Sequence, residues 1–315
     1  MLFRAVTVML QAIRDSVSLQ QLAVELKEVD EDQCQRCARI LRESLTAEGC
    51  AADDPRVVNL YLPMYFWLQG VRRGHQGRTL FVGFHCPQGG GKTTSTRHLK
   101  TLLAAEGVRA EAISIDDFYL TYAERRKLAE DNPENPILQV RGNPGTHDLD
   151  LAGSVLRQLR EAGSVQIPRF DKALHDGQGD RLPESQWTTV SDCEVVIVEG
   201  WCLGFTAVST PDNPHLGVVN DILRSPQWTG LHDILDCFMV FRVPDPAVVY
   251  TWREEAEARL REEGRGAMTQ EQVVAFVDRY MPAYQQYLPG LYTRDWGVPA
   301  LQVTLDPSRQ PIAPA

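Results

Sequence analysis

A glycine-rich segment between residues 83 and 94, GFHCPQGGGKTT, holds the residues whose types and spacing most clearly predict chemistry. Successive glycines let backbone N–H groups turn inward on phosphate oxygens, and a lysine after them reaches the outer phosphates. A hydroxyl next to the lysine ligates Mg2+, and a following helix offers its positive N-terminus. We therefore predict a site for a nucleoside triphosphate. Its expected residues are Gln88, Gly89, Gly90, Gly91, Lys92, Thr93 and Thr94.

One position departs from the regular pattern of such a loop. The pattern has a glycine five residues before Gly91, and this chain has Cys86 there, followed by Pro87. The alternative is a glycine-rich turn in an unrelated kind of protein. An apolar run at 79–84 precedes the loop and a helix-compatible stretch at 94–104 follows it, and this order favours the phosphate site.

Carboxylates follow two further apolar runs of the chain. Asp116 and Asp117 come directly after a predicted strand at 110–115. Phosphoryl transfer needs a carboxylate that accepts the proton of the acceptor hydroxyl, and adjacent side chains leave an extended segment on opposite sides. We expect Asp116 to accept this proton and Asp117 to contact water that is bound to the metal ion. The alternative is that the pair caps the next helix.

Glu199 follows the predicted strand 194–198 and has the form of a Walker B carboxylate, which polarises water on Mg2+. Many buried strands end in an acid, so this assignment depends on the phosphate loop upstream. The expected metal contacts are Thr93, Asp117 and Glu199.

Basic side chains gather in three places. Arginine binds carboxylates and phosphates with a bidentate fork, so these positions are candidates for anion binding. The candidates for substrate contact are Arg141, His147, Arg169, Lys172 and Arg181. Arg253 opens a charged helical stretch, and we expect it to act with Lys92 and Asp116 in catalysis. The alternative for the stretch 253–265 is a solvated helix face, because glutamates alternate with its arginines.

Apolar runs and helical stretches alternate from residue 79 onward, which indicates an α/β fold with a largely parallel sheet flanked by helices. In such sheets, ligands bind at the carboxyl ends of the strands. We expect a helical N-terminal extension at 1–75, a catalytic domain at 76–315 and a lid at about 250–270. Two segments rich in Pro, Asn and Gly, 131–148 and 168–183, are expected to be irregular loops that cover the site.

Composition limits the classes of function. The formal net charge of the 315 residues is −10, so the surface as a whole repels nucleic acid and anionic membranes, and an anionic substrate needs a local basic cluster. The seven cysteines are scattered, and Cys34 and Cys37 lie in a helical pattern without a second pair at zinc spacing. The stretch 1–14 is mildly amphipathic, but acids follow it quickly, unlike in transit peptides. We expect a cytoplasmic protein.

Several longer motifs together resemble the D-glycerate 3-kinases of plants and cyanobacteria. These motifs are CPQGGGKTT (86–94), SIDDFYLT (114–121), RGNPGTHD (141–148), PRFDK (168–172), GDR (179–181), EGWCLGF (199–205) and YLPGLY (287–292). The resemblance covers about residue 57 to the C-terminus. That family is a branch of the P-loop kinases that include phosphoribulokinase, uridine kinase and pantothenate kinase.

The resemblance implies a P-loop kinase fold and the ATP- and Mg2+-dependent phosphorylation of D-glycerate at its 3-hydroxyl, as in photorespiration. It also implies that Asp116 is the general base and Glu199 the Walker B acid. Two alternatives stay open. One is a kinase for another small alcohol, such as a nucleoside or pantothenate. The other is a nucleotide-binding regulatory ATPase, which would need no acceptor base.

Overall fold

The structure is a computed structural model that describes residues 30–77, 79–264 and 266–312. The first 29 residues of the predicted N-terminal extension, with the amphipathic stretch 1–14, lie outside these residues. Within the described ranges, no helix is long and apolar enough to cross a membrane.

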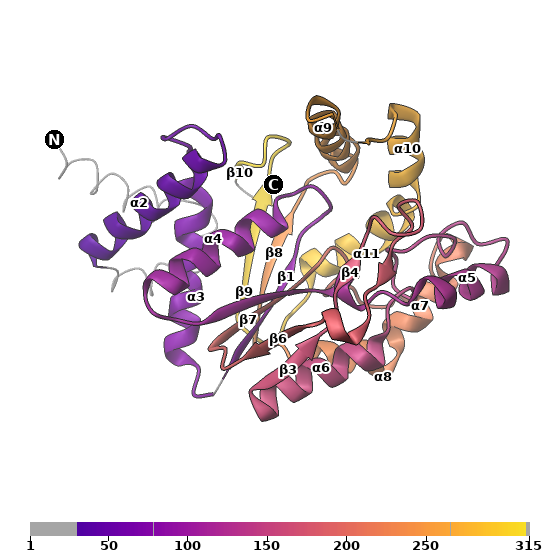
Figure 1. Cartoon of the computed structure of the whole chain (residues 1–315), viewed down its shortest axis with the longest axis horizontal. Coiled ribbons are helices and arrows are strands. Elements are labelled where there is room, and N and C mark those ends of the chain that lie inside the picture. The colour runs from indigo at the N-terminus through magenta and orange to yellow at the C-terminus, as the bar shows by residue number, and fades with distance from the viewer. Residues whose placement is uncertain (1–29, 78, 265, 313–315) are drawn as a thin grey trace.

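A six-stranded sheet forms the centre of the molecule (Figure 1). Its strand order is β10-β9-β8-β1-β7-β2, and only the edge pair β10 and β9 is antiparallel. The strands are β1 Leu80–His85, β2 Ala110–Ser114, β7 Val195–Gly200, β8 Cys237–Arg242, β9 Ala300–Leu305 and β10 Pro311–Ile312. The prediction of a mostly parallel sheet flanked by helices is confirmed.

Helices cover both faces of this sheet because its central strands are apolar on both sides. On β1, Leu80, Val82 and Phe84 join one hydrophobic cluster and Phe81 joins the other. The helices on the first face are α2 Glu31–Ala47, α3 Leu62–Gly74 and α4 Lys92–Ala105. Those in the second cluster are α6 Leu149–Ala162, α7 Gly217–Arg224, α8 Pro226–His232, α9 Val248–Glu262, α10 Gln270–Asp278 and α11 Met281–Thr293.

The described part of the predicted N-terminal extension packs directly on the sheet. It consists of α2, a π-helical turn at Val57–Tyr61 and α3, and it shares one hydrophobic cluster with β1, β7, β8 and β9. Cys34 and Cys37 are buried in this cluster, and burial raises the pKa of Cys34 to about 12 and that of Cys37 to about 11. Both thiols are therefore neutral packing residues at physiological pH. The domain boundary near residue 75 stays a prediction.

Two segments differ from the expectation. The predicted strand 110–115 ends at Ser114, because Ile115–Phe118 forms a 3-10 helix that the Ser114 hydroxyl caps by accepting the N–H of Asp116 at 3.2 Å. The segment 168–183 is not wholly irregular, since β4 Phe170–Asp171 pairs with β5 Asp180–Arg181 in a small antiparallel sheet. A second small sheet pairs β3 Ser164–Ile167, which precedes this segment in the chain, with β6 Thr188–Ser191, which follows it.

The other predicted loop is irregular as expected. Between α5 Tyr122–Asp131 and α6, the backbone forms no helix or strand, and its one regular contact is an isolated bridge between Tyr119 and His147. The predicted lid corresponds to α9 Val248–Glu262 and the connection to α10, which lie at one end of the molecule (Figure 1). Whether this region closes over a ligand stays a prediction.

Candidate active site

The phosphate loop connects β1 to α4 with a tight backbone. α4 begins at Lys92, two residues earlier than predicted, and Gly91 caps it in the left-handed conformation at φ 93°. Gly89 is also left-handed at φ 80°, and a Cβ there would lie 2.6 Å from the Cβ of Trp252. A Cβ on Gly90 would lie 2.6 Å from the Cys86 sulfur. The glycine run is therefore required by conformation and by space.

The Cys86 side chain fills the space under this loop. It is fully buried, and its thiol donates to the carbonyl of Pro87 at 3.3 Å. Burial raises the pKa of Cys86 to about 12, so the thiol stays neutral. A small side chain at this position is thus compatible with the turn, and the departure from the regular pattern does not disrupt the loop.

Distant parts of the chain hold the phosphate loop in place. The hydroxyl of Tyr284, on α11, accepts the N–H of Gln88 at 3.0 Å. The Arg309 guanidinium donates to the carbonyl of Gly89 at 2.8 Å and lies over the Trp252 ring. No local sequence pattern indicated Tyr284, Arg309 or Trp252. Their effect is to fix a loop whose glycines would otherwise be mobile.

Lys92 and Glu199 meet because β1 and β7 are neighbouring parallel strands. Phe84 is the register partner of Glu199, so the carboxylate emerges next to the loop. The Lys92 ammonium lies 3.0 Å from a carboxylate oxygen of Glu199. Burial alone would lower the pKa of Lys92, but Glu199 and Asp116 raise it above its ordinary value. Lys92 is therefore charged in the site.

Asp116 is held at the end of β2 by two side chains. Its carboxylate accepts from the Lys172 ammonium at 2.7 Å and from the Tyr119 hydroxyl at 2.8 Å. Burial would raise the pKa of Asp116, but Lys172 and Lys92 outweigh it and lower the pKa to about 2. The group is thus a carboxylate throughout the physiological range, as the role of proton acceptor requires.

Asp117 does not share this environment. Because Ile115–Phe118 is a 3-10 helix, Asp117 turns away and is not among the residues that line the cavity next to Asp116. It accepts from Arg169 at 3.0 Å and from the N–H of Phe170 at 3.3 Å. Asp117 and Arg169 thus contact each other, and the metal contact expected of Asp117 and the substrate contact expected of Arg169 stay predictions.

Arg181 and His147 also lie behind the cavity wall. Arg181 donates to the carbonyl of Tyr119 at 2.9 Å and to Asp148 at 3.1 Å. The His147 ring packs on Tyr119 with 4.6 Å between centroids, and burial lowers the pKa of His147 to about 4. Neither residue lines the cavity. Both support Tyr119, which in turn contacts Asp116.

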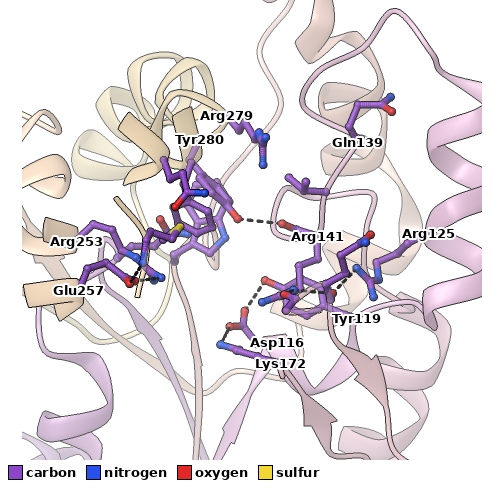
Figure 2. Close-up of a pocket in the computed structure, with 18 of the residues that line it drawn as sticks. Asp116, Tyr119, Arg125, Gln139, Arg141, Lys172, Arg253, Glu257, Arg279 and Tyr280 are labelled. Atoms are coloured by element: carbon purple, nitrogen blue, oxygen red, sulfur yellow. Dashed lines mark hydrogen bonds and ion pairs between the residues drawn. The ribbon is translucent and has the colours of Figure 1, made fainter. Parts of the chain in front are cut away.

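Arg141 lines the cavity, but its guanidinium is occupied. It donates to the carbonyls of Gly177 and Gln178 at 2.7 and 2.6 Å. Arg125, a residue that the sequence did not single out, donates to the carbonyls of Gln178 and Gly179 from the other side. These two arginines fix the segment that follows Lys172, and Figure 2 shows them beside Asp116 and Lys172.

Arg253 faces the cavity from α9 and forms an ion pair with Glu257. Its guanidinium also lies over the Phe276 ring, 4.7 Å from the centroid. Glu257 is 2% exposed and accepts the N–H of Met268 at 2.8 Å, so this pair joins α9 to the segment before α10. Arg253 lines the cavity, and its expected part in catalysis stays a prediction.

These side chains surround one cavity of about 1470 Å³. Of the predicted phosphate and metal residues, Gln88, Gly89, Lys92 and Thr93 line it, whereas Gly90, Gly91, Thr94 and Glu199 do not. Its charged lining has seven cations and four acids, a local positive excess within a chain of net charge −10. The cations are Lys92, Arg125, Arg126, Arg141, Lys172, Arg253 and Arg279, and the acids are Asp116, Glu130, Asp176 and Glu257. This agrees with the expected basic cluster.

Comparisons with known proteins agree with this geometry. The chain is 35% identical over 278 residues to "D-glycerate 3-kinase, chloroplastic" of Arabidopsis thaliana, and the match covers 82% of this chain and 61% of that protein. It is 35% identical over 259 residues to "Uncharacterized kinase mug58" of Schizosaccharomyces pombe, covering 75% of this chain and 91% of that one. The chain thus spans about three fifths of the length of the plant relative.

A solved structure of D-glycerate 3-kinase from Cryptococcus neoformans superposes with a TM-score of 0.72 at 29% identity, covering 80% of this chain and 97% of that chain. The resemblance to D-glycerate 3-kinases inferred from the motifs is confirmed. Residues 81–222 match the phosphoribulokinase / uridine kinase family. The chain, with its phosphate loop, its Asp116 and its parallel sheet, belongs to the phosphoribulokinase / uridine kinase family.

Proposed function

We propose that this chain transfers the γ-phosphoryl group of ATP to the 3-hydroxyl of D-glycerate, giving 3-phosphoglycerate and ADP. The observation that carries this proposal is that Lys92 of the phosphate loop and the carboxylate of Asp116 line the same cavity. They are close enough that Lys92 lowers the pKa of Asp116. A donor site and a proton acceptor side by side support transfer to an alcohol over simple hydrolysis.

The residues at the loop fit the triphosphate of ATP. Gly89 and Gly91 turn the backbone, α4 directs its N-terminus toward the cavity, and Lys92 is charged. Helix N-termini and inward N–H groups favour phosphate oxygens. We propose that Lys92 contacts the outer phosphates, with Gln88 to Thr94 around the inner ones.

Magnesium fits the hydroxyl of Thr93 better than an all-protein site. Among the described residues, no group of three His, Cys, Asp or Glu side chains could hold a metal ion. Mg2+ commonly takes phosphates, water and one or two protein oxygens, and it would neutralise the charge that develops on the phosphates. Thr93 lines the cavity and Glu199 lies against Lys92, so Thr93 would bind the ion and Glu199 would orient its water.

We propose that Asp116 contacts the hydroxyl of the acceptor. In a loose phosphoryl transfer, the carboxylate orients the hydroxyl and takes its proton as the new bond forms. Tyr119 fixes the carboxylate through a 2.8 Å hydrogen bond, and Lys172 compensates its charge. Lys172 reaches Asp116 from a different segment of the chain and lines the same cavity.

Glycerate fits the charge of the cavity because it is a small carboxylate and the lining carries more cations than acids. The names of the plant and fungal relatives support the same acceptor. An acidic protein needs such a local cluster to hold an anion. We further propose that the reaction takes place in the cytoplasm and serves photorespiratory glycerate salvage, although the plant relative is named chloroplastic.

The test is coupled ADP release from ATP and Mg2+ with D-glycerate, L-glycerate, uridine, pantothenate or no acceptor. We expect D-glycerate to raise the rate at least tenfold above the acceptor-free rate, and chelation of Mg2+ to abolish it. Turnover with uridine or pantothenate alone would identify a kinase for a different alcohol. Equal ADP release in all five reactions would identify a regulatory ATPase and reject the proposal.

A further inference from the structure

The cations that line the cavity differ in whether they have a partner. Six of the seven contact protein oxygens, either acidic side chains or backbone carbonyls. The pairs are Lys92 with Glu199, Arg125 with Gln178 and Gly179, Arg126 with Glu130, Arg141 with Gly177 and Gln178, Lys172 with Asp116, and Arg253 with Glu257. Arg279 alone among these seven forms no ion pair or side-chain hydrogen bond within the described part of the chain.

Arg279 is nevertheless held in a defined place. It lies at the junction of α10 and α11, and the side-chain amide of Asn143 donates to its backbone carbonyl at 3.0 Å. The hydroxyl of the next residue, Tyr280, donates to the carbonyl of Arg141 at 2.9 Å. A Cβ on Gly142 would lie 2.3 Å from the Tyr280 ring, so the glycine makes room for it. The segment 141–143 thus fixes the backbone of Arg279.

The position of Arg279 in the cavity suits the end of a small acceptor that is remote from its reacting hydroxyl. Figure 2 shows Arg279 at the upper side of the drawn site and Asp116 at its lower side, with Arg141 between them and Arg253 to the left. The phosphate loop already supplies Lys92 and the N-terminus of α4 to the triphosphate. An acceptor whose hydroxyl contacts Asp116 directs its remaining groups away from Asp116, toward the wall that carries Arg279.

A guanidinium that no protein group occupies is chemically suited to an oxyanion, which it binds through two parallel N–H donors. We propose that Arg279 binds the carboxylate of the acceptor and thereby selects an acid over a plain alcohol. The inference rests on the proposed function, since it assigns the anionic end of the same substrate. It adds a specificity-determining residue that the sequence patterns did not indicate.

The experiment compares wild type with Arg279→Gln, Arg279→Lys and, as a matched control, Arg97→Gln. Arg97 is exposed, pairs with Glu48 and does not line the cavity. Loss of a charge-assisted pair with a carboxylate corresponds to about a 10- to 100-fold weaker interaction. We expect Arg279→Gln to raise the KM for D-glycerate by about that factor, with the KM for ATP within about twofold of wild type. Arg279→Lys keeps the charge and loses the fork, so a smaller rise is expected.

A direct binding measurement removes the dependence on turnover. Calorimetric titration of D-glycerate into protein saturated with ADP and Mg2+ is expected to give the same weakening in Arg279→Gln and none in Arg97→Gln. Unchanged glycerate affinity in Arg279→Gln overturns the inference, as does a rise in the KM for ATP with no change for glycerate. If Arg279→Gln does not fold, wild-type constants in Arg279→Lys overturn it instead.

The outcome separates this inference from the proposed function. If wild type phosphorylates D-glycerate and the Arg279 variants match it, only the inference fails. If wild type uses pantothenate instead, the proposed function fails. The KM for pantothenate, which also carries a carboxylate, then tests the role of Arg279 in the same variants. If wild type uses only an uncharged acceptor such as uridine, both fail.

Discussion

The two ends of the cavity are built in different ways. The donor end is one continuous segment, β1, the glycine loop and the start of α4, and backbone groups form most of it. The acceptor end consists of side chains from segments far apart in the chain, and nearly all of them are charged and paired. Phosphate is the same in every nucleotide, so backbone donors suffice for it. An acceptor must be distinguished from others, which requires particular side chains at particular places.

This difference also affects how each end responds to change. The donor end depends on conformation and space, because Gly89 is left-handed and lies against Trp252, and Gly90 lies against the Cys86 sulfur. The acceptor end depends on charge compensation, because Asp116 is half-buried and remains ionised through Lys172 and Lys92. Substitutions at the donor end should therefore change nucleotide binding, and substitutions at the acceptor end should change turnover and its pH dependence.

The largest expected effect belongs to Asp116→Asn. The amide cannot take a proton, so we expect kcat to fall by about 100-fold or more. ATP binding should stay nearly intact, because Asp116 lies outside the phosphate loop. Steady-state kinetics and nucleotide titration measure the two quantities.

The neighbouring Asp117→Asn is the matched control, since Asp117 contacts Arg169 and Phe170 instead of the cavity. Its kcat should stay within about fivefold of wild type, because its contacts are structural. Full activity in Asp116→Asn, or an equal loss in both variants, would contradict the assignment of the base.

A smaller effect is expected from Gly90→Ala at the donor end. The added Cβ would lie 2.6 Å from the Cys86 sulfur and 3.0 Å from the Trp252 ring. Overpacking of this kind costs about 1–3 kcal/mol, so we expect the KM for ATP to rise about tenfold. Adding Cys86→Ala removes the sulfur and should restore part of the affinity.

Gly74→Ala serves as the control for this variant, because a Cβ there meets nothing within 4 Å. Normal ATP affinity in Gly90→Ala would show that the loop has more space than the geometry implies. Failure of Cys86→Ala to restore any affinity would place the strain at Trp252 alone.

The smallest expected effect is a shift in pH dependence with Lys172→Gln. Burial raises the pKa of Asp116, and Lys172 is the largest influence that lowers it. Without Lys172 the pKa must rise, so a larger fraction of Asp116 is protonated as the pH falls. The acid limb of the kcat profile should move to higher pH, with a several-fold loss of activity at pH 5.

Lys127→Gln is the control, since Lys127 is exposed and pairs with Asp131 on α5. Its acid limb should coincide with that of wild type. An unchanged profile in Lys172→Gln would mean that Lys172 does not control the ionisation of Asp116 when the acceptor is bound.

Much of the fold could be predicted from patterns in the chain. Each central strand is a short apolar run between turn signals, and helices between the strands indicate a parallel sheet, whereas the order of the strands came from the structure. The error at Ile115–Phe118 arose because an apolar run does not mark where a strand becomes a turn. The strand ends at Ser114 because the Ser114 hydroxyl caps the turn that follows.

Site residues that lie next to one another in the chain could be predicted from the sequence. The loop from Gln88 to Thr94 functions through backbone N–H groups that are adjacent in the chain, so its spacing is sufficient to identify it. Asp116 and Glu199 were found in the same way, because parallel strands bring their carboxyl ends to one edge of the sheet. Their positions follow from the strand pattern, and the assignment of Glu199 depends also on the phosphate loop upstream.

Only the tertiary structure decided which basic side chains are available to a ligand. Arg169 and Arg181 carry the same charge as Arg279, but they contact Asp117, Tyr119 and Asp148. Arg279 lies more than a hundred residues after the segment 141–143 that fixes it, and no spacing predicts that contact. A guanidinium binds whichever oxygen the fold brings to it. The amino-acid sequence therefore determined which groups this protein has, and long-range packing determined which of them remain unpaired.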